Sequence, residues 1–216
     1  MFRRDRQERE NLYKGPVGQR KFKRNGGLML YDAVVIGVSA GGLAALTRLL
    51  GILPASYPVP VIVVQHRSRD ERTLLEEVLQ AKCKIRIRQV EEKEPMNAGT
   101  AYLAPPDYHL LIEANHSFSL SYDAPVNYSR PSIDVMFETA AHVFGARLLG
   151  IILTGANADG SFGMKMIRKH GGTTIAQDPA TAEYPEMPKS AIKTGSIQKI
   201  MELDAIGNFL LALAKK

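Results

Sequence analysis

Residues 37–41 read Gly-Val-Ser-Ala-Gly, which is the pattern G-x-S-x-G. In this pattern the serine, here Ser39, can act as the nucleophile of an acyl-transfer reaction. A five-residue match is weak support by itself, so the elements expected on either side of it determine whether Ser39 is a credible nucleophile. The match lies between the apolar run Val34–Ile36 and a helical pattern that begins at Leu43. A tight turn between a strand and a helix pushes a hydroxyl outward, which favours a nucleophilic role for Ser39.

Glycines on both sides of Ser39 fit the same interpretation. Gly37 permits a sharp turn, while Gly41 and Gly42 let the N-terminus of the following helix approach without side-chain collisions. A helix N-terminus exposes backbone N–H groups that stabilise negative charge. The Ala40 N–H is therefore a candidate donor to the oxyanion that forms when Ser39 attacks a carbonyl group.

A serine nucleophile needs a base, and the five histidines differ in where the expected elements place them. His66 directly follows the run Pro60–Gln65 and so stands at the carboxyl end of an expected central strand. Neighbouring parallel strands bring their carboxyl ends to one edge of a sheet, where ligand sites assemble. We therefore expect His66 to be the base that accepts the hydroxyl proton of Ser39. The other four lie at an expected strand start, in a turn or on helices: His109, His116, His142 and His170.

The base needs a carboxylate that orients the imidazole and stabilises the imidazolium. Two aspartates follow expected strands, Asp159 and Asp178. Position alone favours Asp159, because the glycine-containing loop 154–160 can carry its side chain toward His66. Asp178 stays open as the alternative at this point. Either aspartate could instead serve local structure, for example as a helix cap.

Two other chemistries, nucleotide binding and metal binding, fit the sequence less well than acyl transfer. Residues 37–42 resemble the dinucleotide-binding pattern G-x-G-x-x-G, but Ser39 occupies the position where a glycine lets the backbone approach the pyrophosphate. Gln65-His66 stands where an acidic ribose partner belongs, and the Walker pattern G-x-x-x-x-G-K-[ST] is absent. The histidines show no close spacing that indicates a metal site. The sequence thus predicts neither a nucleotide, a metal nor another cofactor.

Short β-branched runs alternate with helical patterns along most of the chain. This order predicts an α/β fold with a doubly wound, mainly parallel sheet covered by helices on both faces. A long helix is expected between Pro131 and Gly145. The other expected strands and helices are Asp32–Ile36, Leu43–Leu53, Pro60–Gln65, Asp70–Gln80, Lys84–Val90, Leu148–Leu153, Phe162–Lys169, Thr173–Ala176 and Asp204–Ala214.

The middle of the chain differs in character from the rest. Thr100–Leu103, His109–Glu113 and Ser117–Ser121 are short runs joined by turns, and together they predict an antiparallel hairpin at one edge of the sheet.

Charge is distributed unevenly along the 216 residues. Residues 1–27 hold nine of the 28 Lys and Arg residues and three of the 22 Asp and Glu residues, so this segment carries the whole formal net charge of +6. We expect a basic, disordered tail over 1–27 and one domain over 28–216, with no nucleic-acid partner. No stretch approaches the roughly 18 apolar residues of a membrane span, and the single cysteine excludes an intrachain disulfide. A cytoplasmic protein is expected.

Six blocks of the sequence together resemble the catalytic domain of chemotaxis-type protein-glutamate methylesterases, the CheB family. The resemblance covers about residues 31–214, and the blocks occur in the family's order and spacing. They lie at 36–42, 64–66, 102–109, 130–137, 153–160 and 176–181.

The resemblance implies a serine hydrolase that removes methyl esters from the γ-carboxyls of chemoreceptor glutamates, with deamidation of receptor glutamines as a second reaction. It implies Ser39 as nucleophile, His66 as general base and Asp159, rather than Asp178, as the orienting carboxylate. It also implies the Ala156 N–H as an oxyanion donor. The loop glycines Gly155 and Gly160 belong to the same block.

Members of the family usually carry an N-terminal receiver domain, for which this chain has no room, so regulation by phosphorylation in cis is not predicted. The expected partners are methylated cytoplasmic helices of chemoreceptors, without membrane insertion. Ala40 and Glu186 depart from residues common in the family. The alternative hypothesis is a catalytically silent relative that binds a receptor or signalling partner.

Overall fold

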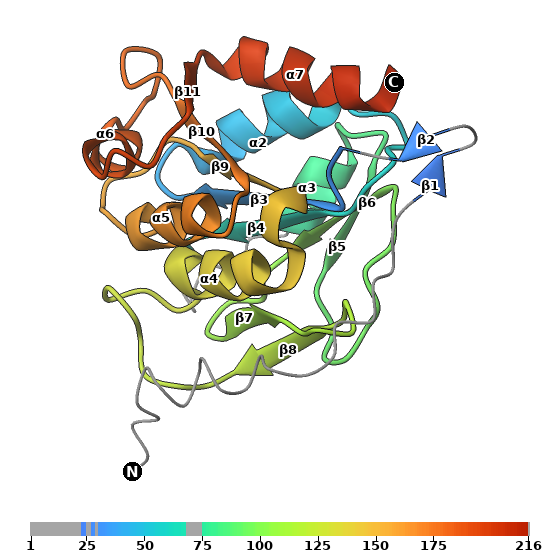
Figure 1. Ribbon diagram of the computed structural model, residues 1–216, viewed down its shortest axis with the longest axis horizontal. Helices are drawn as coiled ribbons and strands as arrows, with labels where there is room; N and C mark the ends of the chain where they lie inside the picture. Colours follow the sequence, from blue (N-terminus) through green and yellow to red (C-terminus); the bar gives the residue numbers. More distant parts are fainter. Residues whose placement is uncertain (1–22, 25–26, 29, 68–74, 216) are drawn as a thin grey trace.

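The computed structural model describes residues 23–24, 27–28, 30–67 and 75–215. Its main sheet has seven parallel strands in the order β11-β10-β9-β3-β4-β6-β5, with helices on both faces (Figure 1). The strands are β3 (Ala33–Val38), β4 (Val61–Gln65), β5 (Arg86–Gln89), β6 (Thr100–Leu103), β9 (Leu148–Ile152), β10 (Thr173–Gln177) and β11 (Lys199–Met201). The predicted doubly wound α/β fold is confirmed.

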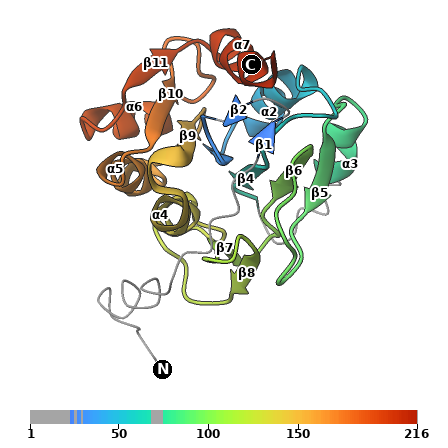
Figure 2. The ribbon, with the colours of Figure 1, turned by 45° about the vertical axis from the view of Figure 1, so that its right-hand side comes forward.

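Helices form a layer on each side of this sheet. In Figure 2, α2 and α7 lie on one side of the strands, and α4 and α5 lie on the other. The helices are α2 (Gly42–Gly51), α3 (Leu75–Gln80), α4 (Ile133–Phe144), α5 (Ser161–Lys169), α6 (Glu186–Lys193) and α7 (Leu203–Lys215), and a short 3-10 turn, η1 (Gly145–Arg147), follows α4.

Each face of the sheet has its own apolar core. Successive side chains of a strand point to opposite faces, so Val34 and Ile36 of β3 join α2, α3 and α7, while Ala33 and Val35 join α4, α5 and α6. Every residue of β3 is buried, as expected for a strand covered on both sides. Burying one such Val or Ile side chain contributes about 1.5–3 kcal/mol, which holds the strand ends in fixed positions.

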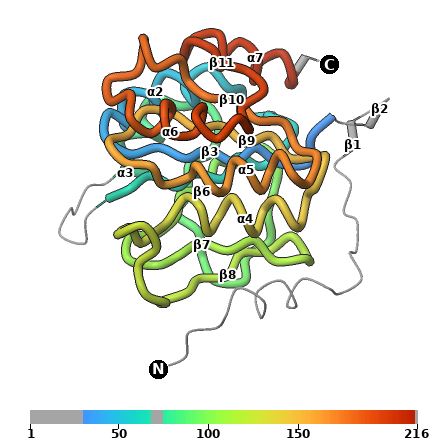
Figure 3. Tube along the Cα trace, turned by 60° about the vertical axis from the view of Figure 1, so that its left-hand side comes forward, coloured from blue at the N-terminus to red at the C-terminus, as the bar shows by residue number. Residues whose placement is uncertain are grey.

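The antiparallel hairpin is a sheet of its own. Strands β7 (His109–Ile112) and β8 (Phe118–Ser121) pair with each other and lie beyond α4 (Figure 3), where the Ile112 N–H donates to Thr139 Oγ1 of that helix at 3.1 Å. The grouping of Thr100–Leu103 with this hairpin was wrong. That run is β6, fully buried and paired in parallel with β4 on one side and β5 on the other.

Helix α6 and strand β11 were not predicted from the sequence. Helix α6 has Pro188 at its third position, which the first turn of a helix tolerates but which obscures the pattern. Strand β11 has only three residues, and two of them are exposed.

The prediction of a disordered segment over 1–27 falls mostly outside the described residues. Of this segment the structure describes only residues 23–24 and 27, which belong to the paired strands β1 (Lys23–Arg24) and β2 (Gly27–Leu28). Within the described part of the chain, no helix is long and apolar enough to cross a membrane.

Candidate active site

The carboxyl ends of β3 and β4 bring Ser39 and His66 together. The two strands are neighbours in the sheet, and their register pairs Val38 with Gln65, so the residues that follow emerge side by side. Backbone hydrogen bonds fix both positions: the His66 N–H donates to Val38 O at 3.1 Å, and the Ser39 N–H donates to Thr154 O at 3.0 Å. This is the edge at which open parallel sheets gather ligand sites.

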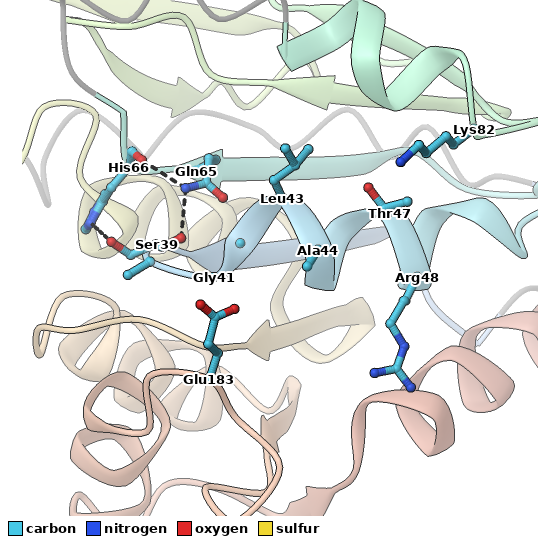
Figure 4. Close-up of a pocket in the computed structure, with 12 residues that line it drawn as sticks. Ser39, Gly41, Leu43, Ala44, Thr47, Arg48, Gln65, His66, Lys82 and Glu183 are labelled. Atoms are coloured by element: carbon cyan, nitrogen blue, oxygen red, sulfur yellow. Dashed lines mark hydrogen bonds between the residues drawn. The ribbon is translucent and has the colours of Figure 1, made fainter.

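Ser39, His66 and Asp159 form one hydrogen-bonded chain. Ser39 Oγ lies 3.2 Å from His66 Nδ1, and His66 Nε2 lies 2.8 Å from Asp159 Oδ2 (Figure 4 shows the first contact). The His66 side chain is 13% exposed and that of Asp159 is fully buried. A carboxylate can only accept, so the proton of a neutral imidazole sits on Nε2, and Nδ1 is left to accept the Ser39 hydroxyl proton.

Asp159 is held at the N-terminus of α4. Its carboxylate accepts hydrogen bonds from the backbone N–H groups of Ile133 at 2.7 Å and Asp134 at 3.2 Å, and from Ser132 Oγ at 2.9 Å. Burial by itself would raise the pKa of Asp159, but the hydrogen bonds from His66 and from the Ile133 N–H outweigh burial and lower it. Asp159 is therefore an anion at neutral pH, with a fixed orientation toward the imidazole.

The other candidate carboxylate lies elsewhere. Asp178 follows β10, where its Oδ1 accepts the Ala180 N–H at 2.9 Å and its own N–H donates to Met201 O at 2.8 Å. These contacts stabilise the turn after the strand. The structure thus brings Asp159, and not Asp178, to His66.

The turn that carries Ser39 depends on two glycines and a glutamine. Gly41 has φ of 76°, in the left-handed region that favours glycine. A Cβ on Gly42 would collide with Gln65 Oε1. Gln65 uses its side-chain Nε2 to donate to the carbonyl oxygens of Ser39 and His66, both at 2.9 Å. The side-chain amide of Gln65 therefore links the backbones of the two reactive residues, Ser39 and His66.

The two predicted oxyanion donors are neighbours in sequence of site residues: Ala40 follows Ser39, and Ala156 precedes Asn157, whose side chain contacts His66. Within the part of the chain that the structure describes, the N–H groups of Ala40 and Ala156 have no hydrogen-bond acceptor. The N–H of Gly155, by contrast, donates to Tyr184 O at 2.9 Å. Gly37 lies within β3 and Gly160 immediately precedes α5 with φ of 91°.

Sequence reasoning missed Asn157 near the imidazole. Its Nδ2 lies 3.2 Å from His66 Nδ1, and its Oδ1 accepts the Asp159 N–H at 3.1 Å. An asparagine two residues before an aspartate is the only signal in the sequence, and it reads equally well as an ordinary turn.

A second missed group lies behind Asp159. Asn127 Nδ2 donates to Asp159 Oδ1 at 3.2 Å and to Asp134 Oδ2 at 2.8 Å. Burial, followed by the nearby charge of Asp159, raises the pKa of Asp134 to about 6. No local pattern marks these residues, because their contacts join segments far apart in the sequence.

A groove of about 760 Å³ opens beside Ser39 and runs along the outer face of α2. Figure 4 shows His66 and Glu183 at the end near the serine, and Lys82 and Arg48 at the far end. Among the described residues there is no group of three or more His, Cys, Asp or Glu side chains that could hold a metal ion. The groove therefore offers a nucleophile, a base and room for an extended side chain.

Comparison with known proteins identifies the chain's relatives. The sequence model described as CheB methylesterase matches residues 34–210. A Leptospira interrogans protein, provisionally named protein-glutamate methylesterase/protein-glutamine glutaminase, is 46% identical over 86% of this chain and 96% of its own length. A Carboxydothermus hydrogenoformans protein-glutamate methylesterase/protein-glutamine glutaminase is 36% identical over 83% of this chain, which spans about half (54%) of that relative.

Among solved structures, the Thermotoga maritima CheB methylesterase catalytic domain is similar, with a TM-score of 0.81 and 31% identity over 85% of this chain and 98% of that one. The family model, the sequence relatives and the solved structure all indicate the same family. The chain belongs to the CheB methylesterase family.

Proposed function

We propose that this protein is a protein-glutamate methylesterase that hydrolyses γ-glutamyl methyl esters on the cytoplasmic helices of chemoreceptors, and that residues 28–216 form its catalytic domain. The observation that carries the proposal is the hydrogen-bonded chain Ser39–His66–Asp159, which lies at the carboxyl edge of a parallel sheet. Membership of the family and the names of the relatives support the substrate class.

In the proposed reaction Ser39 Oγ attacks the ester carbonyl while His66 Nδ1 takes the hydroxyl proton. Asp159 stabilises the imidazolium through Nε2. The N–H groups of Ala40 and Ala156 are proposed to stabilise the oxyanion. Collapse of the tetrahedral intermediate releases methanol, which takes the proton from His66, and leaves an acyl-enzyme on Ser39. Water, activated by His66, then releases the glutamate.

The same groups also suit deamidation of a glutamine, because only the leaving group differs: ammonia departs in place of methanol. The names of the relatives include this second reaction. A silent binding module is less well supported, because a binding role alone does not require a serine, an imidazole and a buried carboxylate in hydrogen-bonding sequence.

The test is the Ser39→Ala variant. It is expected to fold normally, to release no methanol from methylated receptor and to resist a fluorophosphonate probe, which labels only an activated serine. Ser121→Ala, a change on β8 outside the groove lining, is the matched control and should retain both properties. Undiminished methanol release by Ser39→Ala would overturn the assignment.

A further inference from the structure

The carboxylate of Glu183 lies against the turn that carries the nucleophile. A Cβ placed on Gly41 would be 2.9 Å from Glu183 Oε2, so the acid sits at van der Waals distance from that backbone. Figure 4 shows the Glu183 side chain directed at Gly41, on the Ser39 side of the groove. Since Glu183 is exposed, solvent and substrate both reach it.

The segment that carries Glu183 is held in place. The adjacent Tyr184 N–H donates to Thr154 Oγ1 at 2.9 Å, and Tyr184 O accepts the Gly155 N–H at 2.9 Å. Thr154 Oγ1 in turn donates to Ala40 O at 3.0 Å. Residue 183 is therefore fixed relative to the turn at Ser39, although its side chain is exposed.

No cation neutralises this carboxylate within the described residues, where the ion pairs involve other acids. The two cations of the groove, Arg48 and Lys82, lie at its far end (Figure 4), and Arg48 already pairs with Asp204 at 2.7 Å. The groove is negative where the reaction takes place and positive further along α2.

The proposed reaction changes the charge of its own substrate, because a neutral ester becomes a carboxylate. From this we infer that Glu183 is a specificity-determining residue that admits the neutral glutamyl ester and repels the glutamate carboxylate at Ser39. The inference rests on the proposed function. The repulsion would both exclude unmodified glutamates of the receptor and speed the departure of the product.

The size of the effect follows from Coulomb's law. For two like charges several ångströms apart at an exposed site, an effective dielectric constant between about 20 and 80 gives a penalty to binding that is centred on roughly tenfold, and salt reduces it. The same field also acts on the oxyanion. Turnover is therefore a poor measure of this role, and the binding ratio of charged to neutral ligand is the diagnostic quantity.

The test measures binding to the Ser39→Ala protein, in which neither ligand is converted. The ligands are two forms of one chemoreceptor cytoplasmic fragment, with glutamate or with glutamine at the methylated position, since glutamine is a neutral mimic of the ester. We expect the glutamine form to bind roughly tenfold more tightly at low salt. Adding Glu183→Gln should bring this ratio close to one, mainly by tightening the glutamate form.

Glu186→Gln is the matched control. Glu186 is an exposed acid three residues further on, but it begins α6, lies 3.6 Å from Lys189 and does not line the groove. This variant should keep the tenfold ratio. A ratio near one in the parent protein, or a ratio that Glu183→Gln leaves unchanged, would overturn the inference.

Fluorophosphonate labelling of wild-type Ser39, run in parallel, separates this inference from the proposed function. Failure of labelling would count against the acyl-transfer chemistry itself. Normal labelling with no measurable binding of either fragment would contradict the receptor-based specificity proposed for Glu183.

Discussion

At the residue scale, the carboxylates of Asp134 and Asp159 are buried side by side and share one donor, Asn127 Nδ2. Their pKa values move in opposite directions: hydrogen bonds lower that of Asp159, whereas burial and the charge of Asp159 raise that of Asp134 to about 6. Below a pH of about 6, Asp134 therefore takes up a proton while Asp159 stays ionised beside His66.

The pKa of Asp134 predicts a pH dependence of stability. Its value is about 6 in the folded protein and 3.8 in the reference state, so between these values the folded state binds more protons and stability falls as pH rises. Asp134→Asn lacks this titration. Its free energy of unfolding, relative to wild type, should therefore improve by on the order of 2–3 kcal/mol from pH 4 to pH 7.

Urea unfolding of both proteins at pH 4, 5.5 and 7 measures this difference. The titration of Asp159 changes the free energy of unfolding with the opposite sign, because its lowered pKa gives stability that is lost as the pH falls. Both proteins contain Asp159, so to first order this contribution cancels in the difference between wild type and Asp134→Asn. A constant difference across the three pH values would contradict the role given to Asp134.

Asn157 gives a second prediction at this scale. Asn157→Ala removes the donor at His66 Nδ1 and the acceptor for the Asp159 N–H, and we expect kcat/KM at neutral pH to fall by roughly tenfold. Asn157→Asp keeps that acceptor but places a carboxylate beside the imidazole, which stabilises the imidazolium. The acidic limb of the pH–rate profile should therefore move further to higher pH in Asn157→Asp than in Asn157→Ala, which only removes a donor from the neutral imidazole. Identical profiles would show that Asn157 supports only the fold of the loop.

At the element scale, the junction of β3, β4 and α2 holds Ser39 and His66 through Gln65. A Cβ at Gly42 would displace the Gln65 amide and would also lie 2.9 Å from Val38 Cγ2, a buried side chain of β3, so Gly42→Ala should cost roughly 1–3 kcal/mol of stability. It should cost activity, because the bonds from Gln65 Nε2 to the carbonyl oxygens of Ser39 and His66 are lost. Gln65→Ala should have the same effect by removing the amide.

The two changes act on one contact, so their effects on kcat/KM should not add. We expect each single variant to lose roughly tenfold and the double variant to lose about as much as either one. Fluorophosphonate labelling rates, measured alongside thermal unfolding, give the double-mutant cycle. Additive losses would mean that Gly42 and Gln65 position the site independently.

Elements with a strong local pattern were predictable from the sequence. The run Val34–Ile36 is continuously apolar because β3 is covered on both faces, and the placement of Ser39 and His66 follows from two adjacent parallel strands. The β6 run was misassigned because its pairing partners, β4 and β5, are set by tertiary packing and not by the four residues themselves.

The identity of the carboxylate that contacts His66 was predictable only in part. Position alone favoured Asp159 without deciding it, and the family resemblance supplied the choice. What holds Asp159 in place is the N-terminus of α4, about 25 residues earlier in the chain. Contacts of this kind, and those of Asn127 and Asn157, leave no periodic signal in the sequence.

At the scale of the whole molecule, the site draws on segments from across the chain, each anchored in one of the two cores. Ser39 and His66 follow β3 and β4, Asp159 precedes α5, and Glu183 lies between β10 and α6. All of these lie within residues 34–210, the range matched by the family. By contrast, the whole formal charge of +6 resides in residues 1–27, outside the range matched by the family.

Asp32 anchors the chain immediately before β3. Its carboxylate accepts two hydrogen bonds from the Arg147 guanidinium, both at 2.6 Å, and its N–H donates to Arg147 O at 2.8 Å. We therefore predict that a chain without residues 1–27 folds with a free energy of unfolding within about 1 kcal/mol of the full chain. Its rate on a small neutral ester should be unchanged, since no group of the proposed site is removed.

A second truncation supplies the control. Removing residues 1–33 also deletes Asp32 and the first residue of β3, which leaves the buried part of Arg147 without its carboxylate and should cost about 3 kcal/mol or more. Denaturant unfolding and hydrolysis of p-nitrophenyl acetate measure both truncations. If removing residues 1–27 abolished hydrolysis or destabilised the protein as much as the longer truncation, the basic segment would be part of the catalytic domain, and the boundary proposed at residue 28 would be wrong.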